Sequence, residues 1–228
     1  MTESSNTAET AHAADHIDES DIATLRERIV RLEWDQFQRT NNEGGRAACQ
    51  GNWPVFHQMR LAQFLTWDRP LLESYADDLA EADRVGRNLV TEKYGRMMAS
   101  TAPDEYARNI EPYIPRLSEG RVARQERVIA TQVAWARDFR ARYPRLGEAM
   151  RVLTTSEDTP TATSFETYLR GELGTYSDRT FALYEAMIAG RAAQSGGRGA
   201  NITEETLLHT VRLGGFSDLD EAETAQVA

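Results

Sequence analysis

The stretch SEGRVARQERVIATQVAWARDFRARY, residues 118–143, decides the fold class. Its apolar side chains recur at intervals of three, four or seven residues, which places them on one face of an α-helix. We expect this helix to start at Ser118 and to stop at Pro144, because proline cannot continue a helix. The apolar positions are Val122, Ile129, Val133, Ala136, Phe139 and Tyr143.

The same helical spacing extends outward from this stretch in both directions. Upstream, it predicts helices from Ser20 to about Thr40, from Pro54 to Trp67, and from Asp68 towards Ser100. Gly86 lies within the third of these and marks a close helix crossing or a kink. A short helix is expected in the proline-rich segment 103–115, and another over residues 163–174. Three more are expected: one that starts at Ser177, one around Leu207 to Val211, and a last one that starts at Ser217.

The sequence contains no alternating β-branched runs with hairpin turns and no internal repeat. It therefore predicts an all-α fold, an irregular single-domain helical bundle of about seven to nine helices. Residues 1–19 are small and polar and lack apolar periodicity, so we expect a disordered acidic tail there. The domain is expected over residues 20–222, followed by a frayed C-terminus at 223–228.

The charge of the chain lies mainly at its ends. The net charge of the 228 residues is −10, and residues 1–21 and 203–228 each contain six acidic residues. The body between them is nearly neutral. Acidic tails repel nucleic acid and anionic membranes, so neither is expected as a partner. One cysteine, no export signal and no apolar run of ~18 residues favour the cytoplasm.

Familiar catalytic motifs are absent from the sequence. It has no Walker A loop, no G-x-G-x-x-G after a strand, no H-E-x-x-H, no C-x-x-C and no G-x-S-x-G. Of the four histidines, only His57 and His209 lie in predicted helices, which disfavours a histidine-based metal site or a catalytic triad. No cofactor is indicated, and no metal site is assigned.

The first candidate site is the polar loop NNEGGRAACQ, residues 41–50. Glu43 is a candidate acid/base and Arg46 a candidate anion clamp, while Asn41, Asn42 and Gln50 offer hydrogen-bond donors. The glycines would let the backbone approach a ligand. The alternative is an ordinary helix connection, since asparagine and glycine favour turns for conformational reasons alone.

The second candidate site is the segment from Ser156 to Glu172. Glu166 and Arg170 are four residues apart and would pair on one helix face, close to Tyr168 and downstream of Glu157 and Asp158. Several carboxylates near one arginine suit an acid/base site or a divalent-metal site. The alternative is a capped helix, with Thr163 as N-cap and Glu166 completing a capping box, plus a surface ion pair.

Lys93 is the only lysine of the chain and lies in the string TEKYGR, residues 91–96. A buried lysine would matter, because burial can move its pKa into a catalytic range. Its charged neighbours Glu92 and Arg96 favour a solvated helix face instead.

Four strings in this order resemble a family of bacterial proteins catalogued as domain of unknown function 4125. They are NNEGGRAACQ (41–50), FLTW (64–67), GRNLVTEKYGRMM (86–98) and SEDTPTATSFETYLRGELGTYS (156–177). The resemblance covers roughly residues 22–222 and implies a single domain. It draws attention to the same two polar segments but supplies no activity and no catalytic residues.

Two hypotheses follow for the function. The first is a small-molecule enzyme or ligand-binding protein with a pocket where the loop 41–50 meets 156–172. In it, Glu43 or Glu166 would be the acid/base, and Arg46 and Arg170 the anion clamp. The alternative is a helical protein–protein interaction or regulatory module without catalytic activity, which would present an exposed apolar patch to a protein partner.

Overall fold

The computed structural model describes residues 4–40, 48–194 and 201–226. This part of the chain is helical and contains no strand, only an isolated bridge between Thr159 and Ala162. The predicted all-α fold is therefore confirmed. The α-helices are α1 (Ser4–Gln38), α2 (Trp53–Phe64), α3 (Arg69–Arg84), α4 (Leu89–Thr101), α5 (Pro103–Asn109), α6 (Glu119–Arg142), α7 (Pro144–Glu148), α8 (Phe165–Leu173), α9 (Asp178–Ala193), α10 (Ile202–Leu213) and α11 (Leu219–Ala225).

The described residues form eleven α-helices, whereas the sequence predicted about seven to nine. The predicted helix from Asp68 towards Ser100 is two helices, because Gly86 has a φ of 75°. This left-handed conformation ends α3, and Asn88 then caps α4 by accepting a hydrogen bond from Thr91 N. Pro144 ends α6 as predicted, but it also opens a further short helix, α7.

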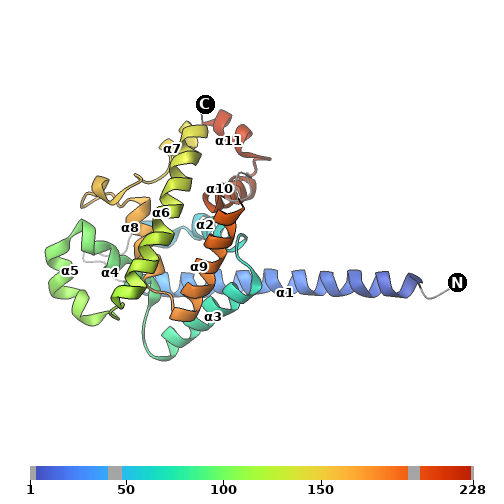
Figure 1. Ribbon diagram of the computed structural model, residues 1–228, viewed down its shortest axis with the longest axis horizontal. Coiled ribbons are helices and arrows are strands. Elements are labelled where there is room, and N and C mark those ends of the chain that lie inside the picture. The colour runs from blue at the N-terminus through green and yellow to red at the C-terminus, as the bar shows by residue number, and fades with distance from the viewer. Residues whose placement is uncertain (1–3, 41–47, 195–200, 227–228) are drawn as a thin grey trace.

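Helix α1 is longer than the predicted helix and begins at Ser4 rather than at Ser20. The added segment lacks an apolar stripe, but it is rich in alanine, which has the highest helix propensity. Figure 1 shows this N-terminal part of α1 projecting from the body of the protein.

Most of the observed N-caps are the residues that the sequence predicts, and one N-cap lies one residue later than predicted. Asp68, Ser118 and Ser177 each accept a backbone hydrogen bond at the start of the next helix. The predicted capping box of Thr163 and Glu166 is wrong, because Ser164 caps α8 by accepting from Thr167 N.

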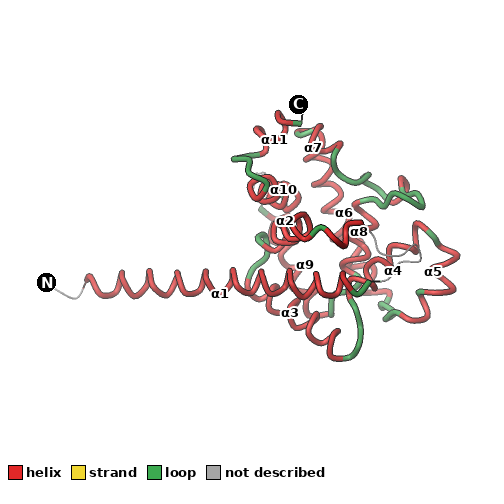
Figure 2. The backbone as a smooth tube through the Cα atoms, turned by 180° about the vertical axis from the view of Figure 1, so that it is seen from behind, coloured by secondary structure: helices red, strands yellow, loops and turns green. Residues whose placement is uncertain are grey.

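Helix α8 lies in the interior of the bundle, against α4 and α6 (Figure 2). A Cβ atom on Gly171 would lie 2.8 Å from the carbonyl oxygen of Lys93, so glycine permits the close approach of α8 to α4. One hydrophobic cluster extends from Ile29 of α1 to Ile188 of α9, and a smaller one joins Phe139 of α6 to Leu219 of α11. These contacts fix the relative positions of α1, α2, α4 and α8, which carry the site described below.

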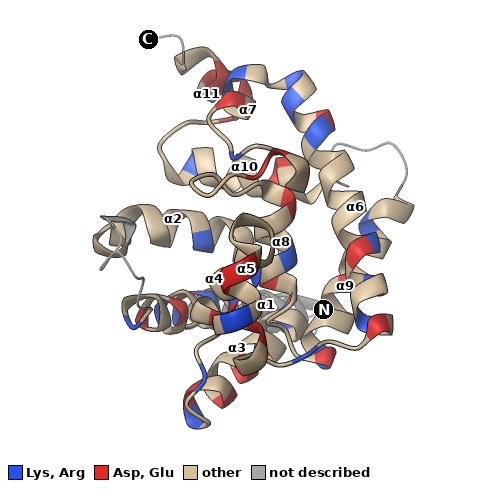
Figure 3. Cartoon of the chain, turned by 90° about the vertical axis from the view of Figure 1, so that its left-hand side faces the viewer, with Lys and Arg blue, Asp and Glu red and all other residues tan. Residues whose placement is uncertain are grey.

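Basic and acidic residues alternate along the described helices, as the blue and red positions in Figure 3 show. None of the helices in the described ranges combines the length and the apolar character needed to cross a bilayer.

Candidate functional site: a buried charged cluster beside a cavity

Glu33 of α1 and Arg60 of α2 form a buried bidentate ion pair. Arg60 Nε lies 2.6 Å from one carboxylate oxygen of Glu33, and Nη2 lies 2.6 Å from the other. The side chains are only 8% and 3% exposed, for Arg60 and Glu33 respectively. Tyr75 of α3 also donates a hydrogen bond to Glu33, over 2.6 Å. The planar fork of arginine matches a carboxylate, so this pair holds α1 against α2 in a defined geometry.

Glu172 of α8 extends this pair into a larger cluster. Both terminal nitrogens of Arg60 lie 3.3 Å from its carboxylate oxygens, and Lys93 Nζ of α4 lies 3.5 Å away. Gln63 and Tyr176 donate hydrogen bonds to Glu172 over 2.7 and 3.0 Å. Two carboxylates and two cations from four helices are thus buried together. We call Glu33, Arg60, Lys93 and Glu172 the charged cluster.

The charged cluster shifts the pKa values of Glu172 and Lys93. Burial alone would raise the pKa of Glu172, but the nearby charges of Arg60 and Lys93 outweigh it and lower the pKa to about 2. Burial would lower the pKa of Lys93, but Tyr168 and Glu172 outweigh it and raise the pKa above the usual value. At neutral pH, Glu172 is therefore a carboxylate and Lys93 an ammonium ion. Lys93 serves as a fixed cation rather than as an amine nucleophile.

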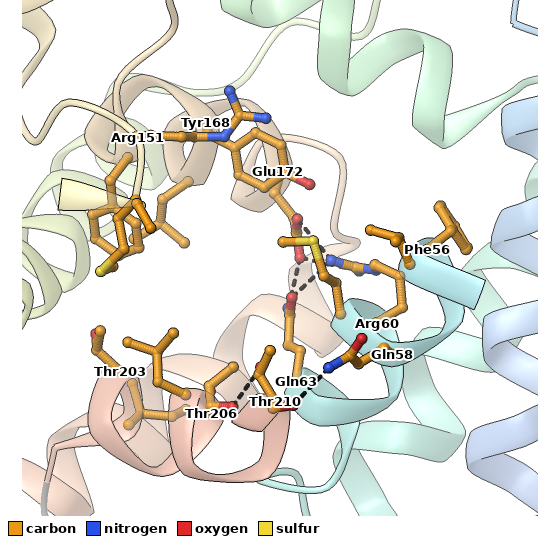
Figure 4. A pocket seen from close by; sticks show the side chains of 18 of the residues that line it. Phe56, Gln58, Arg60, Gln63, Arg151, Tyr168, Glu172, Thr203, Thr206 and Thr210 are labelled. Atoms are coloured by element: carbon orange, nitrogen blue, oxygen red, sulfur yellow. Dashed lines mark hydrogen bonds and ion pairs between the residues drawn. The ribbon is translucent and has the colours of Figure 1, made fainter. Parts of the chain in front are cut away.

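A cavity of about 680 Å³ lies directly against the charged cluster. Its volume is within the range of ~300–1,000 Å³ that is typical of small-molecule sites. Figure 4 shows Tyr168 and Glu172 of α8, Arg60 of α2 and Thr206 of α10 arranged around it. All four members of the cluster are among its lining residues, while most of the remaining wall is apolar and includes Phe56, Met150, Phe165, Leu169, Ile202 and Leu207.

The sequence of α8 explains how one short helix serves both the cluster and the cavity. Tyr168 and Glu172 are four residues apart and therefore lie on the same helix face. Lys93 donates a hydrogen bond to the Tyr168 hydroxyl over 2.9 Å, and its Nζ lies 4.6 Å from the centre of that ring. Gly171 brings α4 close enough for these contacts.

The first predicted site lies mostly outside the described residues. Asn41, Asn42, Glu43 and Arg46 belong to the segment 41–47, which the structure does not describe. Gln50 is described and buried, and its amide donates to the carbonyl oxygens of Phe37 and Thr40. Gln50 therefore closes the C-terminal end of α1, and it is not among the residues that line the cavity.

Glu157 and Asp158 of the second predicted site organise the loop before α8. Glu157 accepts hydrogen bonds from the backbone nitrogen and the hydroxyl of Thr154. Asp158 accepts from the hydroxyls of Ser100 and Thr167 and from Ser164 N. Neither carboxylate lines the cavity.

Glu166 and Arg170 form the predicted i,i+4 ion pair, at 2.7 Å, on a different face of α8. Arg170 also makes a bidentate ion pair with Glu126 of α6, and Glu166 accepts from Thr155 N. The two residues join α8 to α6 and to the preceding loop, away from the cavity lining. A catalytic role for Glu43 or Glu166 stays a prediction, and the geometry of the described residues directs attention to the charged cluster.

Tyr168 is the predicted site residue that lines the cavity. The expectation of a solvated Lys93 is wrong, since its side chain is only 9% exposed. Sequence reasoning also missed Glu33 and Arg60, which look like ordinary charged positions on amphipathic helices. A usable signal was present for Lys93, because every other basic residue apart from histidine is arginine.

A metal ion is not indicated by the described side chains. Within residues 19–40, 50–194 and 201–226, no group of three or more histidine, cysteine or acidic side chains is arranged to hold one. The carboxylates of the charged cluster are instead neutralised by Arg60 and Lys93.

Residues 23–224 match the family described as Protein of unknown function (DUF4125). The chain belongs to this family. The match covers the charged cluster and every residue that lines the cavity apart from Gln226. No curated protein and no solved structure was found to match the chain. The family description gives no reaction and no ligand, so a functional argument must rest on the cavity itself.

Proposed function

We propose that this protein binds a small organic molecule in the cavity between α2, α8 and α10. The observation that carries the proposal is the position of the charged cluster. Four ionised side chains are buried, and they border an apolar cavity of about 680 Å³. Ligand sites combine this kind of apolar wall with a few fixed polar groups.

The free-energy cost of burying the charged cluster supports a ligand-binding role. Burying ions is expensive, and a well-packed hydrophobic replacement is often as stable or more stable. All four side chains of the cluster are buried, and all four line a large cavity, where their charges and hydrogen-bonding groups can orient a ligand.

The exposed apolar residues of α2 support the same proposal. Val55 and Met59 are 48% and 59% exposed, and both line the cavity. Apolar side chains at the edge of a cavity favour entry of an apolar ligand. We therefore prefer a small-molecule site to the docking of a partner protein, which is the alternative outcome of the test below.

The test is a titration with phenylnaphthylamine, a neutral dye whose fluorescence rises in apolar sites. We expect saturable binding of one dye per chain. Thr206 lines the cavity from α10, and a Thr206→Trp variant should place a large ring in the space and weaken binding. Ala134→Trp is the matched control, because Ala134 is exposed on α6 and does not line the cavity.

Two results would contradict the proposal. One is equal dye binding by wild type and Thr206→Trp, which would place the dye elsewhere. The other is no saturable binding to the folded wild-type protein at all. In that case, the interaction module becomes the better hypothesis.

A further inference from the structure

The side chains that line the cavity include one more cation than carboxylates. Within the cluster, Glu33 and Glu172 balance Arg60 and Lys93. Arg151, which follows α7, is a further lining residue. The Arg151 side chain is exposed; it donates a hydrogen bond to the Thr163 carbonyl over 3.4 Å and lies over the Tyr168 ring, 4.8 Å from its centre, while Arg140 donates to the Arg151 carbonyl. No carboxylate in the described part of the chain pairs with it.

Tyr168, whose ring Arg151 contacts, carries a hydroxyl that can donate a hydrogen bond. Lys93 donates its own proton to the Tyr168 oxygen, at 2.9 Å. The phenolic O–H must therefore point to another acceptor, and none is found among the described residues. Two cations contact the Tyr168 ring, with Lys93 Nζ at 4.6 Å and the Arg151 guanidinium carbon at 4.8 Å from its centre. A hydroxyl donor on a ring that two cations contact suits an anionic acceptor.

The remaining wall near Arg151 is apolar. Leu146 and Met150 precede Arg151 in the chain, while Phe165 and Leu169 come from α8 and Leu207 from α10. If the anionic group of a ligand bound at Arg151 and Tyr168, the rest of the ligand would thus contact apolar side chains. Removal of an apolar ligand body from water would favour binding.

We propose that the ligand is an amphipathic organic monoanion, with its carboxylate or sulfonate group against Arg151 and the Tyr168 hydroxyl. Its apolar body fills the space between α8 and α10. This inference rests on the proposed function and adds the chemical class of the ligand. Lys93 acts as a positioning residue, since it orients the Tyr168 hydroxyl through their hydrogen bond.

The test compares two dyes that share one apolar body. Anilinonaphthalene sulfonate carries an anionic group, and phenylnaphthylamine is the same aromatic framework without it. We expect the anionic dye to bind wild type about tenfold more tightly, which corresponds to ~1.4 kcal/mol for charge-assisted hydrogen bonds. Arg151→Gln should remove this difference while leaving the affinity for the neutral dye unchanged.

The matched control is Arg137→Gln. Arg137 is exposed on α6 and does not line the cavity, so this variant changes the net charge by the same amount. It should keep the full preference for the anionic dye. Tyr168→Phe should reduce the preference in part, because it removes the hydroxyl but keeps the ring beneath Arg151.

The outcomes separate this inference from the proposed function. Equal affinity for both dyes, with both affinities reduced by Thr206→Trp, would overturn the anionic ligand but leave the binding site intact. An equal loss of preference in Arg137→Gln and Arg151→Gln would also overturn it, by showing a general charge effect. If neither dye occupies the cavity, both proposals fail.

Discussion

Lys93 Nζ lies 3.5 Å from Oε2 of Glu172, and both side chains are buried. Lys93 is the only lysine among the 26 lysine and arginine residues of the chain. The same ammonium group donates to the Tyr168 hydroxyl at the cavity wall. The Lys93–Glu172 contact therefore links the balanced interior of the charged cluster to the surface that a ligand would touch.

Replacing Glu172 with alanine should strongly destabilise the protein. The change leaves Arg60 and Lys93 buried with one carboxylate between them, and such unbalanced burial costs ~3–5 kcal/mol. Urea denaturation would measure this loss in the free energy of unfolding. Glu81→Ala is the control, because Glu81 forms an exposed ion pair with Arg84 on α3, and solvent screens such pairs so that they add little stability. Equal losses in the free energy of unfolding for Glu172→Ala and Glu81→Ala would contradict the described role of Glu172 in balancing buried charges.

Glu172 should also make the free energy of unfolding depend on pH in the acid range. Its pKa is about 2 in the folded protein, against an ordinary value of 4.5. In the window between these values, the unfolded chain binds the proton more readily, so stability falls as the pH is lowered. The contribution is fully present above about 4.5 and is lost as the pH falls through about 2.

The measurement is the free energy of unfolding as a function of pH for wild type and Glu172→Gln. The difference between the two curves should shrink as the pH falls through that window. A constant difference over the same range would mean that Glu172 does not carry a depressed pKa.

Gly171→Ala should destabilise the contact between α8 and α4. The added Cβ would lie 2.8 Å from the Lys93 carbonyl oxygen and 2.9 Å from Met97 Cγ, so the helices must move apart. Overpacking of this kind costs ~1–3 kcal/mol. Gly190→Ala provides the contrast, since a Cβ there meets no atom within 4 Å and alanine favours the helix. Thermal denaturation should lower Tm for the first variant and raise it for the second.

Arg170→Ala should leave dye binding intact. Arg170 pairs with Glu126 and Glu166 away from the cavity, and its side chain is 33% exposed. Partly exposed pairs contribute ~0.2–1 kcal/mol each, so a modest loss of stability is expected. Titration of the variant with phenylnaphthylamine checks the binding. A lost affinity in a folded variant would restore the sequence-based hypothesis that Arg170 clamps the ligand.

The sequence was a good guide to the helices and a partial guide to the site. Helical spacing located α6 and its end at Pro144, since periodicity reports directly on which face is buried. The sequence marks Gly86 as a close helix crossing or a kink within one helix, but only its φ of 75° shows that this predicted helix is two. Helix number depends on such local turns, which apolar periodicity does not encode.

The candidate site was harder to predict because its charges come from distant positions. Glu33 and Arg60 are 27 residues apart, and Arg60 and Glu172 are 112 apart. Local sequence marks Glu166 and Arg170 as a pair, since they are four residues apart on one helix. It cannot show that Glu172, on the next turn of α8, faces the cluster while that pair faces α6.

The most direct test of the binding cavity is methyl NMR of the methionine-labelled protein during titration with phenylnaphthylamine. Met59 and Met150 line the cavity, whereas Met98 and Met187 do not. We predict saturable shifts of the Met59 and Met150 methyl signals with a common dissociation constant, while those of Met98 and Met187 stay in place. Shifts of Met98 or Met187 without Met59 and Met150 would contradict the account, because they would place the ligand outside the cavity beside the charged cluster.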